Sequence, residues 1–268
     1  MAVKLFVTDL DGTLLPSGKE VSEVNLRAVR EASARGVVVT IATGRMYRAA
    51  LPIAKSLGVD VPIITYNGAL IKSVQGKVFY TNFLPPEHIL AVLDFCRGRG
   101  WHVQLYSDDA LYYAEENSHS RFYESAQQIR GTAVGWDGLR QRTSMVTKLL
   151  IVSDSQEETD ARIRVLRPEF EGRVVVMRSH PLYTEIINPG VSKASGLQRL
   201  AHALGIDIAD TMAIGDSDND LPMLKAAGCS IAMGNALPSV REVCDYVTGT
   251  CEENGFAAAI RDHVLSEA

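Results

Sequence analysis

The segment Lys4-Leu5-Phe6-Val7-Thr8-Asp9-Leu10-Asp11-Gly12-Thr13 is an apolar run that ends in two carboxylates. Its apolar part predicts a buried strand, and Gly12 predicts a bend directly after it. On an extended segment Asp9 and Asp11 face the same side, at the strand end where open α/β sheets bind ligands. Two carboxylates at such a place repel each other unless a metal ion or a proton relieves them. A strand followed by a common Asp-Gly turn explains these residues equally well. The rest of the chain must therefore decide between a binding site and a simple turn.

The composition is that of an ordinary globular protein. The 268 residues are 46% hydrophobic and 22% charged, enough for one large domain or two moderate ones. A net charge of −5 and the lack of any Lys/Arg block argue against non-specific nucleic-acid binding. No apolar run approaches the roughly 20 residues that span a bilayer, and the first one leads into Asp9 rather than a signal-peptide cleavage site. We therefore expect neither nucleic acid nor membrane as a partner.

The four cysteines carry no metal-binding or redox pattern. Cys96, Cys229, Cys244 and Cys251 include no Cys-x-x-Cys pair and no ligand spacing with histidine. We interpret them as buried small residues or free thiols, and we expect a cytoplasmic protein.

Strand and helix signals alternate at both ends of the chain. Helix patterns at 22–34 and 47–57 separate apolar runs at 5–7, 37–41 and 62–65, and each helix pattern closes at a glycine. A helix that begins after Ser192 and a strand at 211–214 continue this alternation of helices and strands. The order predicts an α/β fold, a Rossmann-like doubly wound parallel sheet. Between the two ends, residues 84–184 mix short strands and helices and predict an inserted α+β module. Within it, Tyr106-Ser107-Asp108-Asp109 predicts a polar hairpin turn.

Three loops follow apolar strands, at 9–13, 43–45 and 216–220, and Lys193 lies in the first turn of a helix. Clustered carboxylates, a hydroxyl beside a glycine and a lysine suit phosphoryl transfer, in which the protein positions groups and neutralises charge. A hard cation such as Mg²⁺ fits such oxygen ligands. Calcium loops are rejected, because Leu221 and Leu14 stand where an EF-hand has glycine. Walker A and Gly-x-Gly-x-x-Gly sequences are absent, so nucleotide binding by those routes is not expected.

Taken together, the motifs resemble the haloacid dehalogenase superfamily. Asp9-Leu-Asp11-Gly-Thr13, Thr43-Gly-Arg45, Lys193 and Gly215-Asp216-x-x-Asn219-Asp220 are similar to its four motifs and occur in its order. The insert resembles a type IIB cap, and Asn67-Gly68-Ala69 resembles the Cof-type sugar-phosphatase branch. The resemblance implies a catalytic core of residues 1–83 and 185–268, with a substrate-specificity cap at 84–184 that closes over the substrate.

The resemblance also implies roles for individual residues. Asp9 is the expected nucleophile that forms an aspartyl-phosphate, and Asp11 the expected acid and base. Thr43 and Lys193 complete the expected catalytic set by binding phosphate and offsetting charge. Mg²⁺ is the expected cofactor, held by Asp9, Asp11 (through its backbone carbonyl), Asp216 and Asp220. The expected substrate or phosphate contacts are Leu10, Gly44, Arg45, Asn67, Gly68 and Asn219.

The expected function is therefore Mg²⁺-dependent hydrolysis of small phosphate monoesters, such as sugar phosphates. A phosphotransferase or phosphosugar mutase on the same scaffold is one alternative. A receiver-like phospho-signalling protein is another, although the long insert and the Asp11 acid/base fit it poorly. The sequence identifies neither the particular ester nor the oligomeric state.

Overall fold

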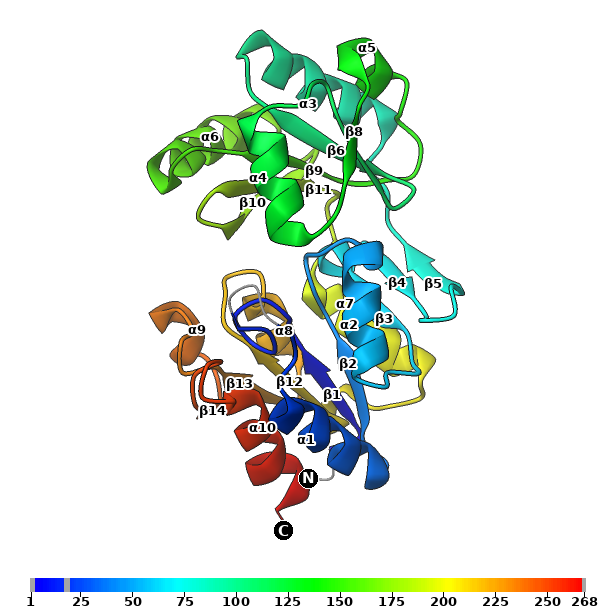
Figure 1. Ribbon diagram of the computed structural model, residues 1–268, viewed down its shortest axis with the longest axis vertical. Coiled ribbons are helices and arrows are strands. Elements are labelled where there is room, and N and C mark those ends of the chain that lie inside the picture. The colour runs from blue at the N-terminus through cyan, green and yellow to red at the C-terminus, as the bar shows by residue number, and fades with distance from the viewer. Residues whose placement is uncertain (1–2, 17–19, 267–268) are drawn as a thin grey trace. The chain divides into compact units, whose positions relative to one another are not determined.

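The computed structural model describes residues 3–16 and 20–266. The chain forms two compact units, one made of Met1–Tyr80 with Ser192–Ala268 and the other of Thr81–Val191. Each unit has its own sheet and is described separately below (Figure 1).

A parallel sheet is the centre of the first unit, as the alternating strand and helix signals predict. Its strands follow the order β14 (Tyr246–Val247), β13 (Cys229–Ala232), β12 (Thr211–Gly215), β1 (Leu5–Thr8) and β2 (Val38–Ile41). Every neighbouring pair is parallel. Buried β1 lies inside the sheet, between β12 and β2, which explains its unbroken apolar run. The α/β fold predicted from the sequence is confirmed.

The strand register sets where the loops emerge. Thr8 of β1 pairs with Ile214 of β12 on one side and with Ile41 of β2 on the other. The residues after these three strands therefore leave the sheet at one edge. That edge carries Asp9, Thr43 and Asp216, although they are far apart in the sequence.

Helices pack against this sheet (Figure 1). They are α1 (Glu23–Ala34), α2 (Tyr47–Ser56), α7 (Lys193–Ala203), α8 (Leu221–Ala226), α9 (Pro238–Arg241) and α10 (Gly255–Ile260). Short 3₁₀ turns occupy Tyr66–Gly68 and Ile208–Asp210, and a π-helical turn, Arg261–Leu265, follows α10. Ser22 caps α1 by accepting a hydrogen bond from the Asn25 backbone N–H, as its sequence position suggests. Helix α1 packs against α10, and α7 packs against α8.

A small second sheet adjoins the end of β2. It contains β3 (Ile63–Thr65), β4 (Leu70–Lys72) and β5 (Val78–Thr81). The Thr43 N–H donates to the Ile64 carbonyl at 2.9 Å, which ties the loop after β2 to β3. The sequence patterns do not predict β4 and β5, because these strands are short and β5 is largely exposed.

A six-stranded sheet is the centre of the second unit. Its order is β10 (Val175–His180), β11 (Tyr183–Ile187), β9 (Val146–Val152), β6 (Val103–Ser107), β7 (Ala110–Tyr113) and β8 (Gly131–Ala133). All neighbours are antiparallel except β7 and β8. The expected polar turn joins β6 to β7, with Asp108 and Asp109 both in the left-handed region, as a tight hairpin requires.

The two faces of the six-stranded sheet are covered by different kinds of side chain. The helices of the second unit are α3 (Pro86–Gly98), α4 (Ser118–Gln127), α5 (Gly135–Arg140) and α6 (Gln156–Glu169). One face forms an apolar core, in which Leu105 and Leu149 meet the apolar stripes of α3 and α6. On the opposite face, buried Lys148 and Glu185 form an ion pair at 2.8 Å, and Tyr123 of α4 packs on Tyr183. The alternation of side chains along β9 produces this division.

The limits of the second unit differ slightly from the insert expected at 84–184. The expected end falls inside β11, a strand that pairs along its whole length with β9 and β10. The chain leaves the second unit only after Val191. Ile186, which resembles the start of the next α/β segment in sequence, packs in the core of the second unit.

Among the described residues, no helix combines the length and the apolar character needed to cross a membrane.

We predict that Leu105→Ala destabilises the second unit by about 2–5 kcal/mol, because the fully buried side chain leaves a cavity between sheet and helices. Both tryptophans of the chain, Trp101 and Trp136, lie in this unit, so their fluorescence during urea unfolding follows it. The control Val165→Ala, on the exposed side of α6, should change the unfolding free energy by at most about 0.5 kcal/mol. Equal effects of the two changes would contradict this description of the core.

Candidate active site

Asp9 is the first residue after β1, and its backbone N–H still donates to Ile214 of β12 at 3.1 Å. The chain then turns sharply, and the Leu10 carbonyl accepts the N–H groups of Thr13, Leu14 and Leu15. Gly12 takes a φ of +81°, and a Cβ there would lie 2.7 Å from Oδ2 of Asp216. The turn therefore requires glycine for two reasons, its left-handed backbone and the close approach of a carboxylate.

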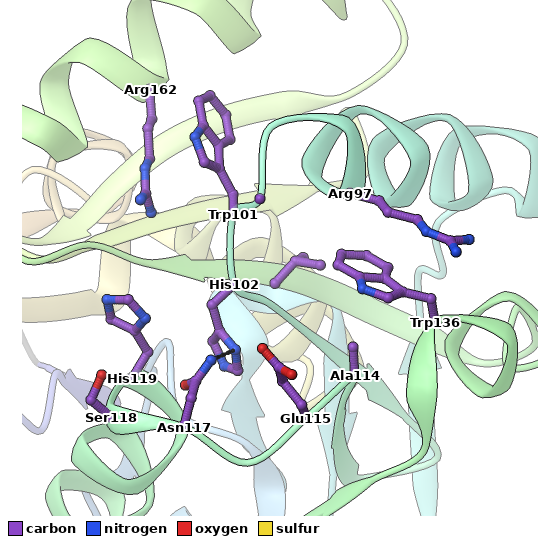
Figure 2. Close-up of a pocket in the computed structure, with 12 residues that line it drawn as sticks. Arg97, Trp101, His102, Ala114, Glu115, Asn117, Ser118, His119, Trp136 and Arg162 are labelled. Carbon is purple, nitrogen blue, oxygen red and sulfur yellow. Dashed lines mark hydrogen bonds between the residues drawn. The ribbon is translucent and has the colours of Figure 1, made fainter.

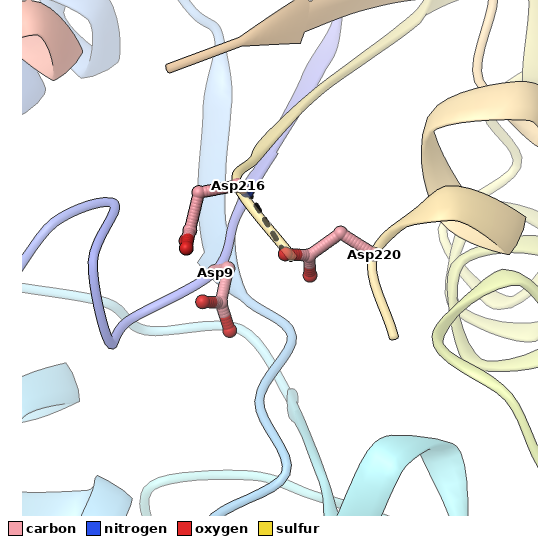
Figure 3. A group of neighbouring side chains, drawn as sticks. All are labelled: Asp9, Asp216 and Asp220. Atoms are coloured by element: carbon pink, nitrogen blue, oxygen red, sulfur yellow. Dashed lines mark hydrogen bonds between the residues drawn. The ribbon is translucent and has the colours of Figure 1, made fainter. Parts of the chain in front are cut away.

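Three carboxylates converge at the edge of the parallel sheet (Figure 3). Asp9 follows β1, Asp216 follows β12, and Asp220 immediately precedes α8. One oxygen from each lies within 4.8 Å of the others. Asp9 and Asp220 are buried and Asp216 is half-buried. This acidic cluster offers only oxygen donors, which suits a hard metal cation.

Lys193 is the cation of the cluster. It is the first residue of α7, whose capping box is made by Ser192 and Ser195. The fully buried Nζ of Lys193 donates to Oδ1 of Asp9 at 2.5 Å and to Oδ1 of Asp220 at 2.5 Å. Burial opposes its charge, but Asp220 and Asp9 outweigh that effect and raise the pKa of Lys193. Lys193 therefore stays charged and links two carboxylates that would otherwise repel each other.

Asp220 also shapes the loop that carries Asp216. Its Oδ2 accepts the backbone N–H groups of Asp216 and Ser217, both at 3.0 Å. Asp216 in turn accepts hydrogen bonds from Thr13 Oγ1 at 2.7 Å and Ser217 Oγ at 2.8 Å. Both oxygens of Asp220 are thus engaged with protein donors, and the carboxylate of Asp216 is oriented by two hydroxyl groups.

The cluster holds more negative than positive charge. With all three carboxylates ionised, one ammonium group leaves two negative charges without a neighbouring cation. Burial, followed by the charge of Asp220, raises the pKa of Asp9, although Lys193 acts in the opposite direction. Burial and Asp220 likewise raise the pKa of Asp216 to about 6. A bound divalent cation would relieve this repulsion.

Asp11 lies outside the acidic cluster. Its side chain is 54% exposed and forms a two-pronged ion pair with Arg45, at 2.8 Å from Nε to Oδ2 and 2.5 Å from Nη2 to Oδ1. Such a paired arrangement fixes both the position and the plane of a carboxylate. The sequence suggests a metal ligand at position 11 and a substrate contact at position 45, but it gives no sign of this pair.

Four further residues connect the loops. The backbone N–H of Asn67 donates to the Thr43 carbonyl at 3.0 Å, and Asn67 Oδ1 accepts from Asn219 at 3.1 Å. Thr43 is buried, and its hydroxyl accepts the N–H of Arg45 at 3.1 Å. Gly68 has a φ of +103°, and a Cβ there would lie 2.2 Å from the Ser192 carbonyl. The turn after β3 thus spans the loops after β2 and β12 and abuts the start of α7.

The structure brings together Asp9, Lys193, Asp216 and Asp220 as one cluster, and links Thr43, Asn67 and Asn219 beside it. The Leu10 side chain is completely buried, so only its backbone is available for binding. Gly44 lies next to Asn67, since a Cβ on it would meet Oδ1 at 3.2 Å. The sequence gives no sign that Ser217 orients Asp216, because a serine between two aspartates carries no distinctive signal.

A family model described as haloacid dehalogenase-like hydrolase matches residues 6–260 of the chain. The chain belongs to this family. Two Bacillus subtilis enzymes named as 5-amino-6-(5-phospho-D-ribitylamino)uracil phosphatases, YcsE and YitU, are 32% and 31% identical to it. YcsE aligns over 98% of this chain and 96% of its own length, and YitU over 97% of each.

The fold agrees with this family. A crystal structure of a haloacid dehalogenase-like hydrolase from Bacteroides thetaiotaomicron matches with a TM-score of 0.88 and 30% identity, over 97% of this chain and 99% of that one. The resemblance found in the four sequence motifs is confirmed. The chain is a hydrolase of a family whose named relatives include phosphatases.

We predict that millimolar Mg²⁺ raises the melting temperature of this hydrolase, because a cation that binds only the folded protein stabilises it. At a hundred times the dissociation constant the gain is about 2.7 kcal/mol. Asp216→Asn should abolish most of the rise, whereas the control Asp60→Asn, on an exposed residue, should keep it. Thermal melts with and without Mg²⁺ measure this directly. The same Mg²⁺ effect in both variants would place the cation elsewhere.

Proposed function

We propose that this hydrolase removes phosphate from small phosphorylated metabolites, in a Mg²⁺-dependent reaction that passes through an aspartyl-phosphate on Asp9. One observation carries the proposal: Lys193 holds the Asp9 carboxylate at 2.5 Å, at the carboxyl edge of the sheet and beside two more carboxylates. A fixed carboxylate next to positive charge is suited to attack an electron-poor phosphorus atom.

In the first step, an oxygen of Asp9 attacks phosphorus, and the bond between phosphorus and the ester oxygen breaks. The departing alkoxide takes a proton from Asp11. In the second step, Asp11 accepts a proton from a water molecule as that water attacks the phosphorus of the aspartyl-phosphate. Free phosphate leaves and Asp9 is restored. One carboxyl group thus acts as acid and then as base.

Arg45 is the positioning residue for the Asp11 carboxyl group. Its guanidinium group binds both oxygens of Asp11 and so fixes the direction in which the carboxyl group points. The exposed position of Asp11 leaves it accessible to a leaving group and to water. Asp9, by contrast, is buried with Lys193, so the two aspartates differ in environment although they are two residues apart.

The transferred phosphoryl group needs donors around its oxygens. We assign this task to Lys193, the Thr43 hydroxyl and the loop residues Leu10, Gly44, Asn67, Gly68 and Asn219, with Leu10 acting through its backbone. The hydrogen bonds that join Thr43, Asn67 and Asn219 support this assignment, because they hold these loops in a fixed arrangement.

Asp9, Asp216 and the backbone carbonyl of Asp11 are the proposed Mg²⁺ ligands. Bound Mg²⁺ would neutralise charge on the phosphoryl group. Asp220 adds negative charge nearby, but its oxygens already bind Lys193 and two backbone N–H groups, so we assign it the task of holding the loop. The oxygen-only donor set and the excess negative charge of the cluster support this assignment.

Small phosphate esters are the proposed substrates. Besides YcsE and YitU, a relative from Yersinia pseudotuberculosis that is 28% identical over 95% of this chain and 93% of its own length is named HMP-PP phosphatase. These names support a metabolite ester, a sugar phosphate or a related compound, as the substrate of this chain. The role of the second unit in substrate choice stays a prediction from the resemblance, and the cytoplasmic location stays a prediction from the cysteine pattern.

We predict that the purified protein with Mg²⁺ releases inorganic phosphate from some members of a panel of sugar, polyol and nucleotide phosphates. Asp9→Asn should lower the rate to background, because the amide cannot serve as the nucleophile. A colorimetric phosphate assay measures both. Absence of release across the whole panel would refute the proposal, and an isomerised phosphosugar without free phosphate would favour a mutase.

We predict that Asp11→Asn slows turnover by about 10²–10⁴-fold but retains phosphoryl transfer to Asp9 from an ester whose leaving group needs no proton, such as p-nitrophenyl phosphate. Intact-mass spectrometry should then detect the added phosphoryl group on Asp11→Asn. The double variant Asp9→Asn/Asp11→Asn is the matched control and should carry none. A phosphoryl group on the double variant, or unchanged turnover in Asp11→Asn, would contradict the assigned roles.

A further inference from the structure

A second pocket, separate from the acidic cluster, lies wholly within the second unit (Figure 2). Its volume is about 310 Å³, at the lower end of the range of about 300–1,000 Å³ that is usual for small-molecule sites. The walls come from the end of α3, the start of β6, the loop between β7 and α4, and helices α5 and α6. No residue of the proposed catalytic set contributes to it.

The pocket contains both tryptophans of the chain. Trp101 and Trp136 line it from different elements and are half-buried. An arginine already lies by each indole: the Arg162 guanidinium is 5.1 Å from the Trp101 ring centroid, and that of Arg97 is 5.9 Å from the Trp136 centroid. Two accessible indoles offer stacking surfaces for a planar ring, and the adjacent positive charges favour an electron-rich or anionic ligand.

The polar groups of the pocket indicate which kind of planar ligand ring could bind there. Figure 2 shows the carboxylate of exposed Glu115 turned toward the pocket. Among the described residues, Glu115 has no hydrogen-bond or ion-pair partner. A carboxylate accepts hydrogen bonds and cannot donate them, so it selects a ring edge with N–H groups. The neighbouring His102 is fixed by Asn117, whose amide donates to its Nδ1 at 3.0 Å.

Of the four common nucleobases, guanine alone presents two adjacent donors, N1–H and N2–H₂, that match the two oxygens of one carboxylate. Adenine and cytosine place a ring acceptor beside their amino group, and uracil flanks its single N–H with carbonyl oxygens. A carboxylate repels those acceptors.

Positive charge is available for a phosphate group. Arg97 has no acidic partner among the described residues, and its guanidinium can bind phosphate oxygens in pairs. Arg162 lies deeper: it is 94% buried, donates to the Val152 carbonyl at 2.8 Å and pairs with Glu158 at 2.5 Å. Its Nε–H has no partner in the described part of the chain, so the back wall of the pocket retains an unused donor.

We propose that this pocket binds a guanine nucleotide, with the base stacked on an indole, its N–H edge on Glu115 and its phosphate near Arg97. The site is additional to the proposed active site and binds the nucleotide without transforming it.

Both tryptophans of the chain line this pocket, so a ligand that stacks on them should change their fluorescence. GMP is titrated into Asp9→Asn protein with a chelator present, so that the nucleotide is not hydrolysed, and calorimetry repeats the titration. We expect a saturable change in tryptophan fluorescence, with AMP at least about tenfold weaker than GMP. A hydrogen-bonded contact to a charged group is worth about 1.5–3 kcal/mol, which corresponds to a loss of tenfold or more in affinity.

Separate variants test the contact with the base and the contact with the phosphate. Glu115→Gln should weaken GMP binding about tenfold or more, whereas the control Glu116→Gln should leave it unchanged, because exposed Glu116 pairs with Arg121 outside the pocket. Arg97→Gln should weaken GMP but not guanosine. All three residues are exposed, and urea unfolding verifies that each variant folds.

Three outcomes would overturn the proposal: no saturable signal with GMP, equal affinity for AMP and GMP, or no effect of Glu115→Gln. Displacement of GMP by inorganic phosphate together with loss of binding in Asp216→Asn would place the nucleotide at the acidic cluster instead. Because the readout is binding in a variant that lacks the nucleophile, its failure leaves the proposed hydrolysis untouched.

Discussion

The ammonium group of Lys193 is the interaction on which the acidic cluster depends. It binds Asp9 from β1 and Asp220 from the start of α8, and it is completely buried. Removal of one partner from a buried ion pair typically costs about 3–5 kcal/mol, because the remaining charge stays buried without compensation. Here the loss would leave carboxylates facing one another. The same ammonium group therefore stabilises the sheet edge and fixes the carboxylate of Asp9, the proposed nucleophile.

The position of Lys193 depends on the turn that follows β3. Asn67 and Gly68 follow β3 with left-handed backbone conformations, and Gly68 touches the carbonyl of Ser192 so closely that a side chain would not fit. Ser192 begins α7 and caps it, and Lys193 is the next residue. The glycine thus sets the distance between the small sheet and α7, while Asn67 connects the same turn to Asn219.

The sequence predicts the fold and the cluster well because strong local signals carry both. The apolar runs of β1, β2 and β12 end in polar loops, and parallel strands deliver those loops to one edge. Short elements such as β4, α5 and β14 are not predicted, because so few residues show no hydrophobic periodicity. The ion pair between Asp11 and Arg45 is not predicted either, because the packing of the two loops sets the geometry that joins them. Asp220 lies in the acidic cluster, where the sequence pattern suggests a metal ligand. Its hydrogen bonds to two backbone N–H groups, which also hold the loop, have no signal in the sequence.

The place of β1 between β2 and β12 has a consequence for how the chain reaches its folded state. Strand β2, one neighbour of β1, is synthesised soon after it. The other neighbour, β12, comes about two hundred residues later. Lys193, the partner of Asp9, follows Asp9 by 184 residues. During synthesis the second unit, Thr81–Val191, is complete before either of these partners exists. Contacts of such long sequence separation form slowly. Asp9 therefore meets its lysine only after the whole insert has been synthesised, and the acidic cluster is among the last parts to assemble.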